Sequence, residues 1–172
     1  ASIGDCRRTP ELDQLFYRTL SKFTHLLVRD AHTRQMIESL GLHAQEVLDP
    51  TFLIEQSIIP AKKPPYIMVS GALTDTQIST ILRLAKKTRL PILSPGYRYA
   101  GIENSFMNVS PSEWVSLIYG STFHITSLFH GAIFSMKGAV PFAAFLTPGK
   151  EGKIGHLMHS LGMESRLIPV DV

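Results

Sequence analysis

The segment from Gly120 to Phe145 constrains the fold more than any other part of this chain, because two short apolar runs flank a helix signal. The run over 123–126 predicts a strand, and the next helix is expected to begin at Phe129 or His130 and to end at Lys137. A second buried strand is expected over 140–145. The segment therefore predicts a strand, a helix and a strand in close succession.

The rest of the chain repeats this alternation of strands and helices. The other expected helices are 11–22, 31–40, 75–87, 111–119 and 150–161, and the other expected strands are 25–28, 47–48, 66–69, 92–93 and 166–170. Such alternation is typical of an α/β protein with a mostly parallel sheet and helices on both faces. We expect one domain over residues 1–172, with the following residues on buried strands of a central sheet: Val28, Val69, Ile92, Ile125 and Ala143.

Composition narrows the class of protein. The chain has 172 residues, of which 44% are apolar and 18% charged, as in ordinary globular domains. Its net charge of +3 comes from scattered residues and forms no basic tract, so nucleic acid is not expected as a partner. The single cysteine, Cys6, excludes an internal disulfide framework and a cysteine-built zinc site. No apolar run approaches the roughly 20 residues of a transmembrane segment, and we expect a cytoplasmic chain.

Small polar residues follow the expected strands. Parallel sheets bind ligands at the carboxyl ends of their strands, and these ends carry Arg29-Asp30, Ser70-Gly71, Ser94 to Gly96, Thr126-Ser127 with His130, and Thr147 to Gly149. Such residues suit a pocket for an anionic, hydroxyl-rich ligand. His130 also begins a helix, where backbone N–H groups and the helix dipole attract anions. Turn chemistry explains each serine and glycine equally well, and His130 could simply cap its own helix.

Three segments resemble the polysaccharide pyruvyl transferase family, and they occur in the family's order. The first is Leu27 to Asp30 with its helix and Gly41-Leu42. The second is the Asp-Pro-Thr turn in 47–53. The third runs from Pro111 through Thr126-Ser127-Leu128-Phe129-His130-Gly131 to Phe142, and 157–167 resembles the family's final helix and turn. Family members transfer the enolpyruvyl unit of phosphoenolpyruvate to a sugar hydroxyl of a surface polysaccharide or exopolysaccharide and leave a pyruvate ketal.

The resemblance implies a Rossmann-like three-layer domain, similar to the C-terminal half of a GT-B-like glycosyltransferase. It also implies a missing N-terminal half-domain as a partner, so the chain would belong to a longer protein and be inactive alone. Phosphoenolpyruvate and a saccharide acceptor are the expected substrates, with no further cofactor and no metal. Two other functions stay open: half of a nucleotide-sugar glycosyltransferase, and a non-catalytic binding domain with a decayed site.

The resemblance assigns roles to six residues. His130 is the expected catalytic residue, because imidazole can both deliver a proton to the methylene carbon and deprotonate the acceptor hydroxyl. The expected substrate-binding residues are Arg29, Ser127, Phe129, Gly131 and Lys153. Arg29 would bind the phosphate or carboxylate of the donor as a planar fork, and we expect it to meet His130 at one sheet edge. Asp30 is better explained as a helix cap.

Other residues depart from the family or have simpler explanations. Leu128 stands where the family often has serine or arginine, and Ser127 where it often has aspartate; an arginine would add a charged hydrogen bond of about 1.5–3 kcal/mol. His156 and His159 have a spacing that can hold zinc, but surface positions explain them better. We expect His124 to be half-buried on its strand and Trp114 to anchor the core.

Overall fold

The computed structural model describes residues 7–55, 57–146 and 151–169 of the chain, the side chains of residues 151 and 152 excepted. The chain divides into two compact units, Ala1–Ile54 and Glu55–Val172. Each unit has its own parallel sheet, of two strands in the first and six in the second. The two units are described separately below.

The first unit contains two helices and a small sheet. Its elements are α1 (Pro10–Leu20), β1 (Leu27–Val28), α2 (Ala31–Ser39), β2 (Gln45–Glu46) and the 3₁₀ turn η1 (Pro50–Phe52). Strands β1 and β2 pair in parallel. The helix α2 begins where the Asp30 side chain accepts a hydrogen bond from the backbone N–H of Thr33 at 2.7 Å, which confirms the expected cap.

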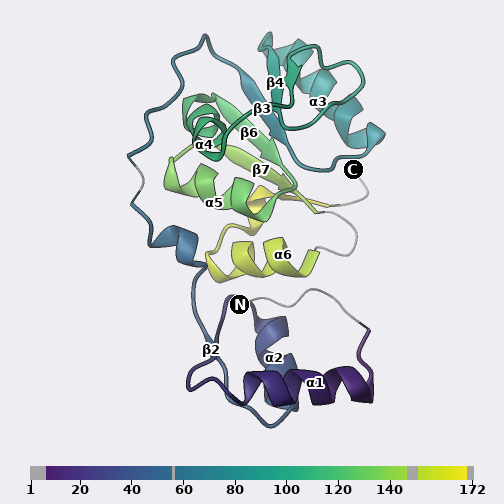
Figure 1. The fold of residues 1–172 in the computed structure, drawn as a ribbon. Coiled ribbons are helices and arrows are strands. Elements are labelled where there is room, and N and C mark those ends of the chain that lie inside the picture. The colour runs from purple at the N-terminus through teal and green to yellow at the C-terminus, as the bar shows by residue number, and fades with distance from the viewer. Residues whose placement is uncertain (1–6, 56, 147–150, 170–172) are drawn as a thin grey trace. The chain divides into compact units, whose positions relative to one another are not determined.

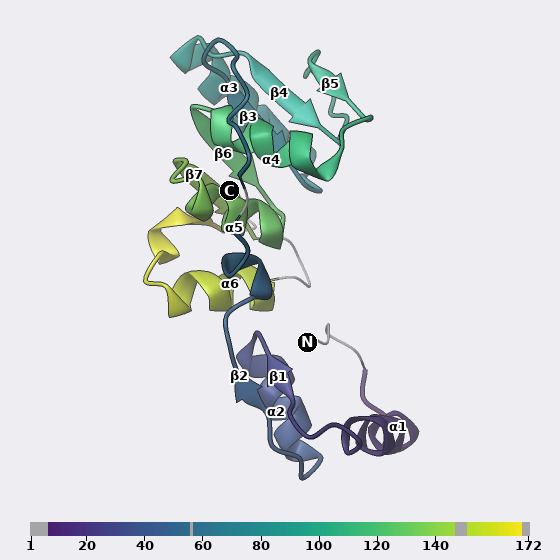
Figure 2. The same cartoon turned by 60° about the vertical axis from the view of Figure 1, so that its left-hand side comes forward.

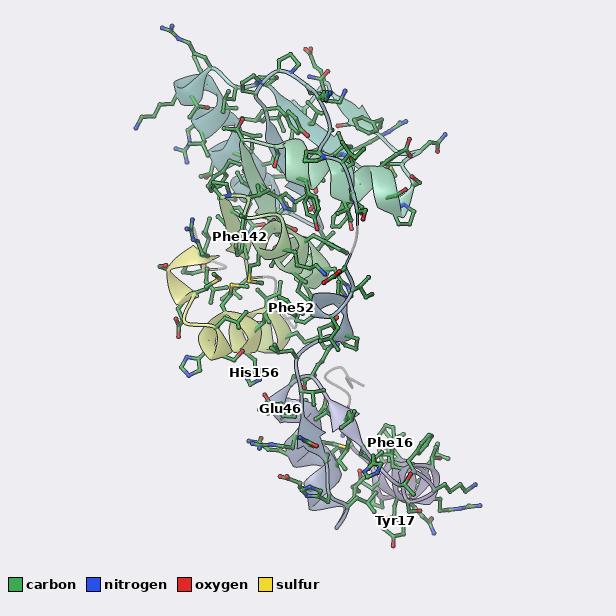
Figure 3. The ribbon with its side chains drawn as sticks, turned by 90° about the vertical axis from the view of Figure 1, so that its left-hand side faces the viewer. Phe16, Tyr17, Glu46, Phe52, Phe142 and His156 are labelled. Carbon is green, nitrogen blue, oxygen red and sulfur yellow. The ribbon has the colours of Figure 1, made fainter. Side chains whose placement is uncertain are left out.

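The core of the first unit is small. It is formed by Val28, Met36, Ile37 and Ala44, and Phe16 of α1 packs against it. Tyr17, next to Phe16 on the same helix, is 48% exposed (Figure 3). Because α1 buries no residue completely, its attachment to the unit rests on one apolar side of the helix.

The second unit is built around the larger sheet, and Figure 1 shows its helices on the two faces. Its elements in chain order are β3 (Ile67–Ser70), α3 (Asp75–Thr88), β4 (Ile92–Pro95), β5 (Ser105–Phe106), α4 (Pro111–Gly120), β6 (Phe123–Thr126), α5 (Phe129–Lys137), β7 (Phe142–Phe145), α6 (Glu151–Ser160), the 3₁₀ turn η2 (Glu164–Arg166) and β8 (Leu167–Ile168).

All six strands of this sheet are parallel, in the order β5-β4-β3-β6-β7-β8. Figure 2 shows β5 at one edge. Counted from β3, the order is 3-2-1-4-5-6, which is the strand order of the Rossmann fold. The direction in which successive strands are added reverses between β3 and β6. Ligands of open α/β sheets bind in the crevice at such a reversal, beyond the carboxyl ends of the strands.

Alternating side chains of the strands cover two cores. Ile67 and Val69 of β3 face the cluster that includes Ile78 and Ile81 of α3. Tyr66 and Met68, which alternate with them, face the cluster that includes Leu117 and Ile118 of α4 and the partly buried Phe134 of α5. This arrangement gives the three layers, with α3 on one face of the sheet and α4 and α5 on the other. The expected α/β class and parallel sheet are confirmed.

Several details differ from the sequence-based expectation. Val28 is buried as expected, but β1 belongs to the separate two-stranded sheet, so the prediction that it joins a central sheet is wrong. The Rossmann-like sheet expected of a domain over 1–172 lies within the second unit. Ala143 is only half-buried, β2 lies two residues before the expected strand at 47–48, and β5 falls between 93 and 111, where no strand was expected.

Candidate functional site

Hydrogen bonds join the loops after β3 and β6 at the point where the strand order reverses. The backbone N–H of Ser127 donates to the carbonyl of Ser70 at 3.1 Å, and its hydroxyl donates to the carbonyl of Ala72 at 2.9 Å. Gly71 has a φ of +108°, and a Cβ atom there would lie 2.2 Å from the Ser127 Oγ. Only glycine satisfies both the backbone angle and the close approach.

A tyrosine from the loop after β4 braces the same place. The Tyr99 hydroxyl donates a hydrogen bond to the carbonyl of Gly71, and its ring stacks on that of Tyr97 with the centroids 6.2 Å apart. Burial, together with the neighbouring Tyr97, raises the pKa of Tyr99 above its ordinary value, so the hydroxyl stays protonated and remains a donor. Hydrogen bonds thus join the loops that follow β3, β4 and β6.

His130 lies in the first turn of α5, directly after these joined loops, and its side chain is exposed. The ring of the half-buried Phe129 meets it edge-on, with 5.4 Å between the ring centroids. Leu128 occupies the N-cap position and provides no side-chain hydrogen bond to the helix. An accessible imidazole therefore stands at the positive end of a nine-residue helix.

The four expected residues of the β6–α5 turn have different surroundings. Ser127 is buried with its hydroxyl proton directed to Ala72, so a ligand could use this hydroxyl only as an acceptor. Gly131 is buried against the Thr126 side chain, where an added Cβ would lie 2.3 Å from the Thr126 Oγ1. Phe129 and His130 are the more accessible pair.

A buried polar chain lies beneath this turn. The Ser70 Oγ is 2.9 Å from both the His124 Nε2 and the Thr126 Oγ1, and the His124 Nδ1 is 2.7 Å from the Ser135 Oγ. Burial lowers the pKa of His124 from 6.5 to about 3, so the ring is neutral at ordinary pH. The expectation of a half-buried His124 is wrong, because the side chain is fully enclosed between the sheet and α5.

Arg29 belongs to the first unit and follows β1. Its Nη1 donates to the Asp49 Oδ2 at 2.6 Å, and the Asp49 Oδ1 accepts the backbone N–H of Thr51 at 3.0 Å. Burial raises the pKa of Asp49, but the hydrogen bonds from Thr51 and the Arg29 guanidinium outweigh it and hold the pKa below its usual range. Two of the expected motifs, the arginine after β1 and the Asp-Pro-Thr turn, therefore form one ion pair.

Arg29 and His130 follow strands of two different sheets. The expectation that both lie at the edge of one sheet is therefore wrong in its premise, since β1 and β6 do not share a sheet. The proposed contact of Arg29 with a ligand stays a prediction.

Lys153 lies in the first turn of α6, which follows β7 and contacts α5. Because β7 is parallel to β6, α6 begins at the same edge of the sheet as α5 does. Lys153 is half-buried.

On the same helix, His159 pairs with Glu164 at 2.7 Å, and no group of three or more potential metal ligands occurs among the described residues. Trp114 packs edge-on against Phe134 in the core, as expected.

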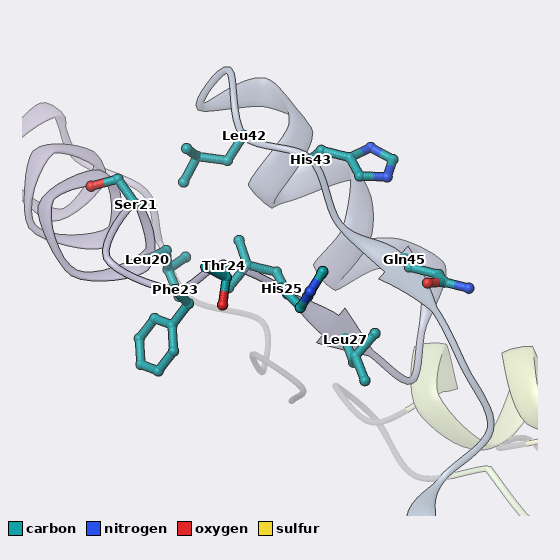
Figure 4. A pocket seen from close by; sticks show the side chains of 10 residues that line it. Leu20, Ser21, Phe23, Thr24, His25, Leu27, Leu42, His43 and Gln45 are labelled. Carbon is teal, nitrogen blue, oxygen red and sulfur yellow. The ribbon is translucent and has the colours of Figure 1, made fainter.

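Among the described residues, one hollow of the first unit and one of the second are lined by residues other than those of this turn. One of about 300 Å³ opens in the first unit between the end of α1 and the residues around β1 and β2, and Figure 4 shows His25 and His43 among the side chains that line it. The other, of about 460 Å³, lies below the start of β4 and is lined by Lys86 and Arg89, among others. Neither is lined by His130 or Arg29, and the sequence patterns indicated neither hollow.

Fold and site together define a class: an α/β protein with Rossmann strand order, whose exposed histidine stands at a helix N-terminus beside the reversal of strand order. The chain belongs to the polysaccharide pyruvyl transferase family, whose model matches residues 1–147. This match spans both units and includes Arg29 and His130, whereas Lys153 lies beyond it. No curated protein matches the chain. Within the described part of the chain, no helix has the length and apolar character needed to cross a membrane.

Proposed function

We propose that this chain transfers a pyruvyl group from phosphoenolpyruvate to hydroxyls of a saccharide unit in a surface polysaccharide or exopolysaccharide. Family membership supports a pyruvyl transferase role on a polysaccharide. One structural observation supports a particular residue as the acid–base group. The exposed His130 begins α5 at the reversal of strand order, where a Rossmann-like sheet binds its ligands.

The reaction requires two proton movements. Carbon C2 of phosphoenolpyruvate gains two bonds to saccharide oxygens and loses its bond to the phosphate oxygen and its π bond to carbon C3, which changes from a methylene to a methyl group. Of the two protons released by the hydroxyls, one is taken up at C3 and the other leaves with phosphate. His130 is the proposed acid–base group, because a positioned imidazole can accept the hydroxyl proton and deliver a proton to C3.

The anionic groups of the donor need positive potential. The start of α5 offers the helix dipole and the first N–H groups of the helix, of which Gly131 provides one. Phe129 would form an apolar side of the donor site, and Ser127 would bind through its backbone or as an acceptor. Arg29 is proposed to bind the carboxylate or phosphate, and Lys153 is a second candidate cation. Leu128 stands where the family often has serine or arginine and offers the donor no polar group, so the donor would depend more on these other groups.

Calorimetry with phosphoenolpyruvate tests the site in three forms of the chain: wild type, His130→Ala and His159→Ala. His159 is the matched control, because it is an exposed helical histidine whose partner is Glu164. We expect His130→Ala alone to weaken binding. In the full-length protein, we expect His130→Ala to lower pyruvyl transfer by about 10²–10⁴-fold, the usual contribution of a positioned acid or base, and His159→Ala to leave it unchanged.

The opposite results would favour a binding domain with a decayed site. These are the absence of phosphoenolpyruvate or phosphate binding at millimolar ligand, together with equal transfer rates in wild type and His130→Ala.

A further inference from the structure

We propose that His124 is a positioning residue for His130. Through hydrogen bonds, its ring holds both ends of the turn that carries Phe129 and His130 against the sheet. The inference rests on the proposed function, since His130 needs precise placement only if it acts on a substrate. His124 itself lies below the turn, fully buried, and has no access to a ligand.

The chain of hydrogen bonds connects three elements. Ser70 ends β3, His124 and Thr126 belong to β6, and Ser135 lies in the middle of α5. All four side chains are 0% exposed. Buried hydroxyl and imidazole groups cost free energy unless they form hydrogen bonds, and core packing alone does not require four joined polar side chains here.

The direction of every proton in this hydrogen-bond chain follows from its Gly131 end, and the Leu128 end is consistent with it. At one end, the backbone N–H of Leu128 can only donate, and it donates to the Thr126 Oγ1 at 3.0 Å. At the other end, the carbonyl of Gly131 can only accept, and it accepts the Ser135 hydroxyl at 2.9 Å. The Ser135 Oγ therefore accepts from His124, so the Nδ1 carries the imidazole proton.

The remaining contacts then have one consistent arrangement. With the proton on Nδ1, the neutral ring has an acceptor at Nε2, which receives the Ser70 hydroxyl proton. The Ser70 Oγ in turn accepts the Thr126 hydroxyl proton. In the other neutral tautomer, Ser135 would have to donate to His124 and could not donate to Gly131. The low pKa of His124, about 3, keeps the ring in the neutral form that this arrangement requires.

The two ends of the hydrogen-bond chain lie on either side of the candidate site. Leu128 and Gly131 are the residues immediately before and after Phe129 and His130. The chain thus fixes the N–H before this pair and the carbonyl after it to the same buried ring. Gly131 supports this arrangement, because its lack of a side chain lets the Thr126 hydroxyl approach the helix. Trp114 packs edge-on against the His124 ring, with 6.3 Å between the ring centroids.

The first test measures the tautomer of His124 in the unmodified chain by long-range ¹⁵N–¹H NMR at neutral pH. We expect a protonated Nδ1 and an unprotonated Nε2. A signal from a protonated Nε2 would overturn the assigned direction of the chain and with it the proposal. The measurement needs neither a substrate nor a variant, so it is independent of the proposed function.

The second test compares His124→Leu and His124→Gln with Tyr66→Phe. Tyr66 is the matched control: it is buried on the same face of the sheet, and its hydroxyl donates to a carbonyl of α4 at 2.6 Å, away from the β6–α5 turn. We expect His124→Leu to increase amide hydrogen exchange at Leu128 much more than at Ile67, whose N–H pairs with the Pro91 carbonyl. Tyr66→Phe should have no such selective effect. Equal increases at both amides would indicate a purely structural role.

Kinetics of the full-length protein give the third measurement. We expect His124→Leu to lower kcat by about tenfold to a hundredfold through misplacement of His130, with a smaller change in KM for phosphoenolpyruvate. His124→Gln should recover part of the rate, because its amide oxygen can still accept the Ser70 proton. If His124→Leu folds and keeps the wild-type kcat, the positioning role is wrong. If instead His130→Ala has no effect, the proposed function fails, while the tautomer and exchange results still decide on the hydrogen-bond chain.

Discussion

Gly131 and Gly155 are both helical glycines, but only one of them has space for a side chain. A Cβ atom at Gly131 would lie 2.3 Å from the Thr126 Oγ1, whereas a Cβ atom at Gly155 would meet nothing within 4 Å. The glycine of the Phe-His-Gly motif is therefore required by the buried hydroxyl behind it. This contact explains the absence of a side chain, and the proposed role of the Gly131 backbone N–H does not depend on it.

These two glycines give a matched pair of variants. We expect Gly131→Ala to lower the free energy of unfolding by about 1–3 kcal/mol, since the added methyl group forces Thr126 or α5 to move. Gly155→Ala should raise it by about 0.5–1 kcal/mol, because alanine favours a helix. Urea denaturation of both variants measures the difference. Similar effects of the two substitutions would contradict the close contact at Gly131.

Arg29 has a structural partner in addition to its proposed ligand. Asp49 is 5% exposed and Arg29 23% exposed in their ion pair. We expect Arg29→Ala to destabilise the first unit by about 1.5–3 kcal/mol, as for a charged hydrogen bond. The loss should be smaller when Asp49→Asn is already present. A double-mutant cycle from denaturation curves measures this coupling, and strictly additive effects would show that the pair contributes nothing.

At the scale of elements, local signals predicted structure well and long-range pairing did not. The bounds of β6 and α5 and the start of α4 at Pro111 were predicted because their signals lie within a few residues; at α4 the signal is the Ser110 capping box that the structure shows. The strand β2 was misplaced because Val47-Leu48 is the more apolar run, although Leu48 is 53% exposed and β1 pairs with residues 45–46. Its position depends on a distant partner strand.

The role of His124 could not be read from its strand for the same reason. Strand alternation tells which face a side chain is on, but what covers that face comes from α4 and α5. Ser70 and Ser135 reach the ring from other elements, and no spacing in the sequence joins them. The histidine at the start of α5, in contrast, was predictable, because a strand end and a helix start are adjacent in the chain.

Burial of His124 makes stability depend on pH. Above pH 6.5 the ring is neutral in the folded and the unfolded chain, so its contribution is fully present. As the pH falls from 6.5 towards 3, the unfolded chain binds a proton that the folded chain does not. The free energy of unfolding should therefore fall by up to about 1.4 kcal/mol per pH unit from this group. Denaturation of wild type and His124→Gln at pH values from about 4 to about 7 measures how steeply the free energy of unfolding changes with pH. The variant should show a smaller slope than wild type. Equal slopes would contradict the lowered pKa of His124.

For the whole molecule, the sequence indicated the class and family but not the division into two sheets. The rule that ligands collect at the carboxyl ends of strands holds within one sheet, and it was applied to β1 and β6 together. The sequence carries no signal for which sheet a strand joins, since this is decided by pairing with a distant strand. The chain around Leu53, which is 83% exposed, connects the two units.

This connection predicts where proteolysis divides the chain. Leu53 and Ile54 are exposed, whereas by Ala61 the backbone is anchored to α4 through the Ser116 carbonyl at 2.9 Å. Exposed segments without regular hydrogen bonds are the preferred sites of cleavage. We expect limited chymotrypsin treatment to cut after Leu53 and to release a C-terminal fragment that retains the six-stranded sheet and unfolds cooperatively. Mass spectrometry of the fragments checks the site, and first cleavage inside β3–β8 would contradict the division.

The same fragment tests whether Arg29 of the first unit contributes to donor binding. It retains His130 and the start of α5 but lacks Arg29. If Arg29 binds the donor, the fragment should bind phosphoenolpyruvate about tenfold or more weakly than the whole chain, the loss expected for one charged hydrogen bond. Calorimetry of the purified fragment and of the uncut chain under the same salt conditions gives the two affinities. Equal affinities would remove Arg29 from the donor site and leave its ion pair with Asp49 as its role, because the second unit would then contain every group that the donor contacts.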